Sequence, residues 1–84
     1  MLEGSQVDWA GHANDLNYLK REMQDFDEAV ELALDYAIQN PDTLVIATAD
    51  HETGGLLIES SSPTDYTAPE VKFSFNTGIG YGSH

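Results

Sequence analysis

Cysteine is absent from this sequence of 84 residues, and basic side chains are scarce. Without cysteine the chain has neither a disulfide framework nor thiolate ligands for a metal ion. Only 3 Lys and Arg stand against 15 Asp and Glu, so the formal net charge is −12. Such a charge repels nucleic-acid phosphates and anionic membranes and attracts cations. We therefore expect no nucleic-acid or membrane partner, and we look for metal ligands among the acids.

Long hydrophobic runs are missing as well. No stretch approaches the roughly 20 apolar residues that a membrane-spanning helix needs. No signal peptide is expected, because a polar stretch from Glu3 follows Met1 and Leu2 at once. The length allows one small domain, and a chain this short buries too little surface to be more than marginally stable. We assign residues 1–84 to a single, partial domain.

One long amphipathic helix dominates the pattern. Asn14 or Asp15 is a plausible N-cap, and the Asn40-Pro41 dipeptide ends the helix. Apolar residues recur at three- and four-residue spacing, which predicts a buried stripe: Leu19, Met23, Phe26, Val30, Ala33, Leu34, Ala37 and Ile38. The acids of the opposite face are predicted to be solvated: Glu22, Asp25, Glu28, Glu31 and Asp35.

Short strand-like segments follow the helix. Residues 44–47 form an apolar, β-branched run that predicts a strand buried on both faces, as in parallel sheets. Residues 56–59 and the alternating residues 71–75 predict two further short strands, separated by the loop-like residues 60–69. Because a buried strand needs neighbours on both sides, we predict an α/β fold that is a fragment of a larger, helix-flanked, mostly parallel sheet.

Two Asp-His combinations are candidate functional sites. Asp50 and His51 follow the predicted buried strand, at the carboxyl end where open α/β sheets bind ligands, and a Gly pair then allows a turn. Asp8 and His12 are four residues apart, so one helical face would present both to a divalent ion. Each combination alone is also compatible with a solvated loop, a surface pair or a helix cap. His84 ends the sequence after a Gly-rich stretch.

Beyond these single signals, the sequence resembles the bacterial alkaline phosphatases. Residues 3–15, EGSQVDWAGHAND, resemble the metal-ligand segment of that family, and residues 25–30, DFDEAV, are similar to the helix that follows it. Residues 43–55, TLVIATADHETGG, resemble the strand and loop that hold the family's second metal cluster. The motifs occur in the family's order, and the resemblance is sharpest over residues 1–55.

The resemblance implies specific metal ligands. Asp8 and His12 match ligands of a first catalytic zinc, with His84 as its last ligand, although the family's Gly-His-Thr sequence is cut off here. Asp50 and His51 match ligands of a second zinc, and Glu3 matches a ligand of an accessory magnesium. Imidazole and carboxylate suit zinc, and oxygen ligands suit magnesium. The implied activity is the hydrolysis of small phosphate monoesters.

Other family features are missing. The sequence has no Asp-Ser-Ala-like nucleophile motif, and its only Arg, Arg21, falls inside the predicted helix rather than at a phosphate site. We therefore expect a fragment that is inactive alone and that needs the rest of a parent enzyme. The resemblance implies a periplasmic or secreted parent. An uncovered helix stripe would favour self-association, so a homo-oligomer is also considered.

Two alternatives remain open at this level. A phosphomutase or a sulfatase of the same superfamily would also place Asp-His pairs at strand ends, although a sulfatase needs a Cys or Ser nucleophile. A non-catalytic acidic module could bind Ca²⁺ or a basic partner through the acids between Glu22 and Asp35. Trp9, between two candidate ligands, either lines the phosphate site or packs as an ordinary aromatic.

Overall fold

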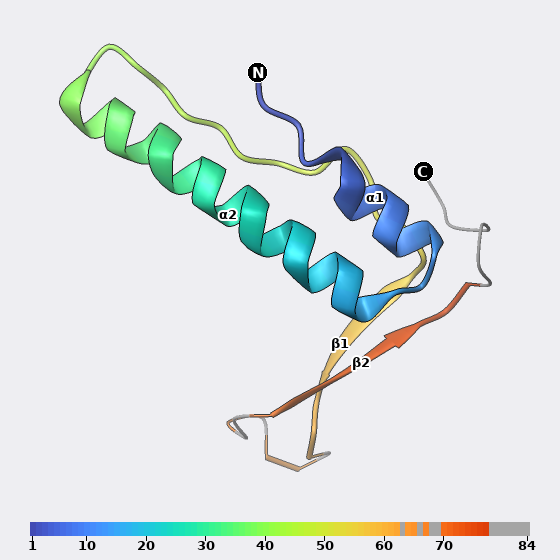
Figure 1. Ribbon diagram of the computed structural model, residues 1–84. Helices are drawn as coiled ribbons and strands as arrows, with labels where there is room; N and C mark the ends of the chain where they lie inside the picture. Colours follow the sequence, from blue (N-terminus) through green and yellow to red (C-terminus); the bar gives the residue numbers. More distant parts are fainter. Residues whose placement is uncertain (63, 66, 68–69, 78–84) are drawn as a thin grey trace.

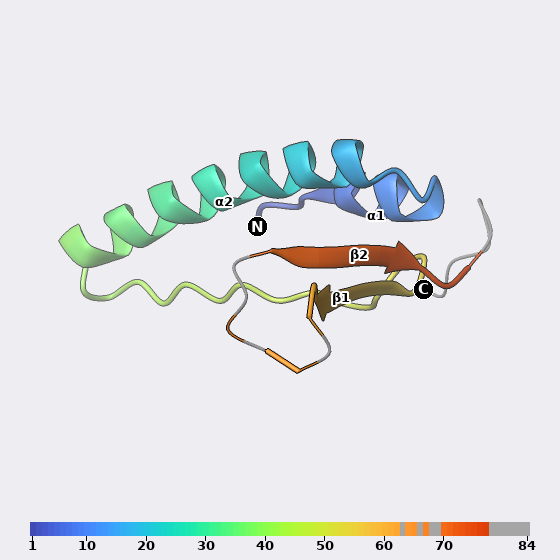
Figure 2. The ribbon, with the colours of Figure 1, turned by 90° about the horizontal axis from the view of Figure 1, so that it is seen from below.

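The computed structural model describes residues 1–62, 64–65, 67 and 70–77. It contains helix α1 (Ser5–His12), helix α2 (Leu16–Gln39) and strands β1 (Leu56–Ser60) and β2 (Val71–Phe75) (Figure 1). The two helices form one layer, and the segment after α2 lies with the two strands in a second layer (Figure 2). Within the described ranges, neither helix has the length and apolarity needed to cross a membrane.

Helix α2 begins and ends close to its predicted limits. The Asp15 side chain accepts a hydrogen bond from the Tyr18 backbone N–H at 3.0 Å, which satisfies one of the unpaired donors of the first turn. At the other end the Asn40 N–H donates to the carbonyls of Tyr36 and Ala37, and Pro41 follows. Of the two predicted caps, Asp15 is confirmed. Asn14 instead adopts a positive φ of 50° in the turn between the helices.

The apolar stripe of α2 is only partly covered. Five of its positions are half-buried, namely Leu19, Phe26, Val30, Ala33 and Ala37. Met23, Leu34 and Ile38 are exposed, so their prediction as buried residues is wrong for this chain. Beneath the C-terminal part of α2 the second layer consists of one extended segment and not of the two strands, so it covers the helix incompletely (Figure 2). Ala10 of α1 is the fully buried hydrophobic residue of the described structure.

Residues 44–47 do not form the predicted buried strand. In the described structure this segment is extended without strand pairing, and Leu44 and Ile46 are 83% and 76% exposed. It runs back along α2 towards α1 (Figure 1). The physical reason is that a buried apolar strand needs hydrogen-bonded neighbours on both sides, and the described residues supply none for this segment.

The two strands form an antiparallel hairpin rather than part of a parallel sheet. Leu56 pairs with Phe75 and Ser60 with Val71, so both predicted strands are confirmed within one residue while the parallel arrangement is not seen in the described residues. The Lys20 ammonium lies 4.8 Å from the centre of the Phe73 ring, which ties β2 to α2. In the connecting loop, side-chain and backbone hydrogen bonds from Thr67 lower the pKa of Asp65.

Candidate metal centre

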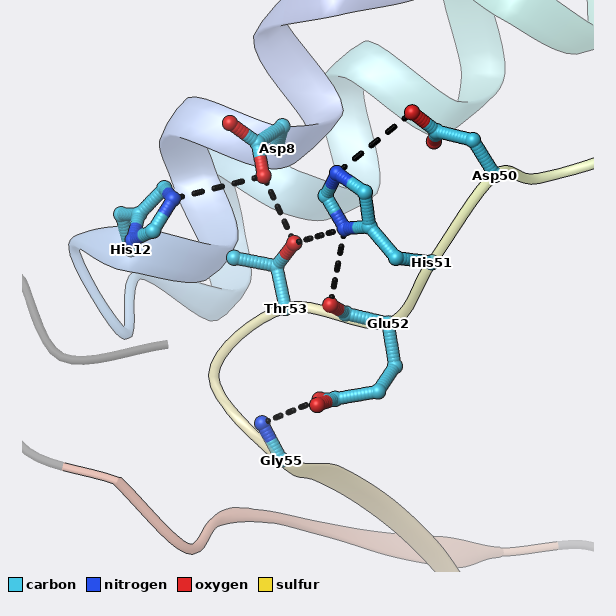
Figure 3. Close-up of polar contacts among 7 residues, drawn as sticks. All are labelled: Asp8, His12, Asp50, His51, Glu52, Thr53 and Gly55. Carbon is cyan, nitrogen blue, oxygen red and sulfur yellow. Dashed lines mark hydrogen bonds and ion pairs between the residues drawn. The ribbon is translucent and has the colours of Figure 1, made fainter. Parts of the chain in front are cut away.

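Asp8 and His12 form a pair on α1, which we call the helix pair. They are one helical turn apart, and His12 Nε2 lies 3.5 Å from Asp8 Oδ1 (Figure 3). Both side chains are about one-third exposed, so a ligand can reach them. Trp9 is 58% exposed, so it is not packed as a core aromatic within the described structure. Its role at a substrate site stays a prediction.

Asp50 and His51 form a second pair, which we call the loop pair. His51 Nε2 lies 3.5 Å from Asp50 Oδ2, although adjacent residues on a regular strand would point to opposite faces. They converge because the chain here is an irregular loop. The Glu52 carboxylate accepts a hydrogen bond from the Gly55 N–H at 2.9 Å and holds the turn that follows. The turn expected from the glycines forms after the pair, at Gly54 and Gly55.

The hydrogen bonding of His51 determines which ring nitrogen can bind an ion. His51 Nδ1 lies 2.9 Å from the Glu52 carbonyl oxygen, and because a carbonyl only accepts, Nδ1 carries the proton. In the neutral ring, Nε2 then has the lone pair, and Nε2 is the nitrogen that faces Asp50. Histidines that bind metals usually donate their other N–H to a carbonyl or carboxylate in this way.

Thr53 connects the two pairs. Its hydroxyl donates to Asp8 Oδ1 at 2.6 Å, and the same oxygen lies 3.2 Å from His51 Nδ1 (Figure 3). This contact joins residues 45 positions apart in the chain. Sequence reasoning missed Thr53, because a threonine between an acid and two glycines carries no signal of a distant partner. The helix pair and the loop pair therefore belong to one polar network.

Two glycines allow the loop to lie directly on α1. A Cβ at Gly11 would stand 3.0 Å from the Cβ, Cγ2 and backbone oxygen of Thr53. Gly54 has a φ of +78°, a left-handed conformation that strains other residues, and a Cβ there would stand 2.6 Å from the Gly11 carbonyl oxygen. The close approach that lets Thr53 reach Asp8 therefore requires glycine at position 11 of α1 and at position 54 of the loop.

Glu3, another predicted ligand, is not part of this network. Glu3 lines an open groove of about 250 Å³ between the N-terminal segment and α2, beside Glu22 and Asp25. His84 lies outside the described residues. Among the residues that are described, no three His, Asp or Glu side chains are grouped so that they could hold a metal ion by themselves. The structure thus brings together Asp8, His12, Asp50 and His51, as two pairs.

Each pair fits half of a zinc site. Two ligands at 2.0–2.1 Å from a tetrahedral ion stand roughly 3.4 Å apart. The nitrogen and oxygen of each pair are separated by 3.5 Å. Carboxylate oxygen and imidazole nitrogen are both ordinary zinc ligands. The chemistry and spacing therefore suit zinc, while the other ligands of each ion would have to come from outside the described pairs.

Comparison with known proteins shows a consistent likeness. Residues 1–75 match the family model for alkaline phosphatase. Alkaline phosphatase 3 of Bacillus subtilis is 44% identical over 77 residues, which cover 92% of this chain and 17% of that protein. The repressible alkaline phosphatase of Saccharomyces cerevisiae is 44% identical over 68 residues, which cover 79% of this chain and 12% of that protein.

Solved structures show the same likeness in three dimensions. The alkaline phosphatase of the Antarctic bacterium TAB5 superposes with a TM-score of 0.75 at 45% identity, covering 96% of this chain and 24% of that one. A mutant of the TAB5 enzyme with Mg bound in the M3 site has the same TM-score at 42% identity. The chain therefore spans a quarter or less of the length of these relatives.

Proposed function

The chain belongs to the alkaline phosphatase family, and from this premise we propose that it carries metal ligands of an enzyme that hydrolyses phosphate monoesters. The observation that supports the proposal best is the pairing of Asp8 with His12 and of Asp50 with His51, each at 3.5 Å. The Thr53 hydroxyl that joins Asp8 to His51 adds to it, because two-metal hydrolases need their two ions close together.

The proposed ligand roles follow the family resemblance. Asp8 and His12, together with His84, are the ligands of one zinc. Asp50 and His51 are two of the ligands of a second zinc. Glu3 binds magnesium, and the magnesium reported for a TAB5 enzyme mutant supports a magnesium site in the family. When bound, two divalent ions stabilise the attacking and leaving oxygens of phosphate transfer.

The residues of this chain prepare that site in two ways. The Nδ1–H of His51, held by the Glu52 carbonyl, orients the ring so that Nε2 faces Asp50. The acidic surplus of the sequence balances the positive charge of the ions, since three divalent ions would bring the formal charge from −12 to about −6. The acids thus favour cation binding without a basic partner.

Catalysis itself requires residues beyond those of this chain. The nucleophile and the phosphate-binding Arg implied by the family have no counterpart in the sequence, so the 84 residues alone are expected to be inactive. The proposed partner is accordingly the rest of the parent enzyme, and the proposed substrate is a small phosphate monoester. A periplasmic or secreted location of the parent remains a prediction from the resemblance.

Zinc titration by calorimetry tests the ligand roles. We expect the chain to bind zinc, and we expect His12→Ala and Asp8→Ala to weaken the binding at least about tenfold, because each removes a direct ligand. Asp35→Ala is the matched control, since Asp35 lies on the exposed face of α2. Zinc binding that is indifferent to His12 and Asp8 but sensitive to Asp35 would contradict the proposal and favour an acidic binding module.

A further inference from the structure

We propose that Thr53 is a positioning residue, which orients Asp8 for metal binding and links the helix pair to the loop pair. This inference rests on the proposed function, and it assigns a role to a residue that is not itself a metal ligand. Its basis is one side chain that contacts both pairs: the Thr53 hydroxyl oxygen lies 2.6 Å from Asp8 Oδ1 and 3.2 Å from His51 Nδ1.

The direction of the hydrogen bonds follows from the chemistry of the groups. An ionised carboxylate only accepts, so the Thr53 hydroxyl must donate its proton to Asp8. The hydroxyl oxygen then accepts from His51 Nδ1, which also donates to the Glu52 carbonyl. A distance of 2.6 Å is typical of a hydroxyl bound to a charged carboxylate. The network therefore runs in one direction, from His51 through Thr53 to Asp8.

Packing keeps the hydroxyl in this position. The Cβ and Cγ2 atoms of Thr53 lie over Gly11, which has no side chain to displace them. Because a β-branched side chain has few allowed χ1 rotamers, seating the methyl group also fixes the direction of the hydroxyl. The methyl group thus packs on α1 while the hydroxyl reaches Asp8, so the two functions of the side chain can be separated by substitution.

The expected consequence is a loss of metal affinity when the hydroxyl is removed. Without its donor, the Asp8 carboxylate is free to rotate and must be ordered when the metal binds. Removing hydrogen-bond partners of metal ligands typically lowers metal affinity 10–100-fold. The effect should be present at the helix pair even when the loop pair is disabled, because Asp8 is the residue that Thr53 directly holds.

Competition titrations of zinc against a chromophoric chelator test this role. Thr53→Val keeps the β-branched shape over Gly11 and removes the hydroxyl, whereas Thr53→Ser keeps the hydroxyl and removes the methyl group. We expect Thr53→Val to weaken zinc binding about 10–100-fold, also in an Asp50→Ala background, and Thr53→Ser to stay near the wild type. Thr48→Val is the matched control, since the Thr48 hydroxyl contacts only the neighbouring Ala49 carbonyl among the described contacts.

The outcomes distinguish this inference from the proposed function. If Thr53→Val binds zinc as tightly as the wild type, or if Thr53→Ser loses as much affinity as Thr53→Val, the positioning role of the hydroxyl is wrong. In either case the wild type still binds zinc, and the proposed ligands stand. Failure of the wild type to bind zinc at all would instead contradict the proposed function and remove the basis of the inference with it.

Discussion

At the scale of single residues, the contact between α1 and the loop depends on two glycines. Gly11 leaves room for the Thr53 side chain. Gly54 adopts a left-handed φ, and a Cβ at this residue would collide with the Gly11 carbonyl oxygen. The Gly54 carbonyl in turn accepts hydrogen bonds from the backbone N–H groups of Asn76 and Thr77, which tie the end of β2 to the loop. A substitution of Gly54 should therefore disturb both the contact with α1 and the hydrogen bonds to Asn76 and Thr77.

Substitution of Gly54 by alanine should loosen this region. The left-handed conformation costs roughly 1–2 kcal/mol for a residue with a Cβ, which corresponds to about 5–30-fold less protection. We expect faster amide hydrogen exchange at Asn76 and Thr77, measured by NMR. Gly4→Ala is the control, because Gly4 has a φ of −85° and the atoms nearest to its added Cβ belong to the Phe26 side chain, away from Asn76 and Thr77. Equal exchange rates in Gly54→Ala and the wild type would show that the loop is not held there.

At the scale of elements, α2 is specified by local signals. Its periodicity, the Asp15 cap and the Asn40-Pro41 stop all lie within the helix or next to it. The structure confirms the helix, the cap and the stop, but not the burial of the whole apolar stripe. Helix α1 likewise places Asp8 and His12 on one face, as their spacing predicts. Because much of the α2 stripe is uncovered, the cap contributes a larger share of its stability than it would in a well-packed helix.

Removal of the Asp15 cap should therefore lower the helix content of the chain. We expect Asp15→Ala to destabilise α2 by about 1 kcal/mol, because the Tyr18 N–H loses its acceptor. Asp15→Asn should retain most of the helix, since asparagine is a comparable cap. Far-UV circular dichroism across a thermal scan gives the comparison. A helix signal unchanged by Asp15→Ala would mean that tertiary contacts, and not the cap, determine the start of α2.

At the scale of the whole molecule, the chain is more open than a complete domain. Its accessible surface is 6658 Å², against about 4900 Å² expected for a folded monomer of this length. Its Cα radius of gyration is 15.5 Å, against about 12 Å for a compact domain. The exposed apolar residues, among them Leu44, Ile46 and Ile38, contribute to this open surface.

This openness and the missing nucleophile lead to the same expectation for activity. The purified chain, supplied with zinc and magnesium, should hydrolyse an aryl phosphate no faster than its His12→Ala variant. The physical reason is that two Asp-His pairs cannot replace the attacking group or the phosphate-binding cation. The measurement is steady-state release of the phenolate. Zinc-dependent turnover that disappears in His12→Ala would show that the chain contains a complete active site.

The sequence by itself determined the elements whose signals are local: α2 with its cap, the two hairpin strands, and the shared face of Asp8 and His12. It also indicated the family, because several motifs occur in a characteristic order. The interpretation of residues 44–47 as a buried strand was wrong for this chain, because pairing depends on neighbours rather than on composition.

Only the tertiary structure decided which distant residues meet. The hydrogen bond from Thr53 to Asp8 spans 45 positions, and no periodicity relates residues so far apart. It forms because Gly11 and Gly54 let the loop lie against α1. This fit depends on side-chain volumes at the contact, which only the folded arrangement of both elements reveals. Local sequence thus specified the two Asp-His pairs, and packing joined them into one polar network.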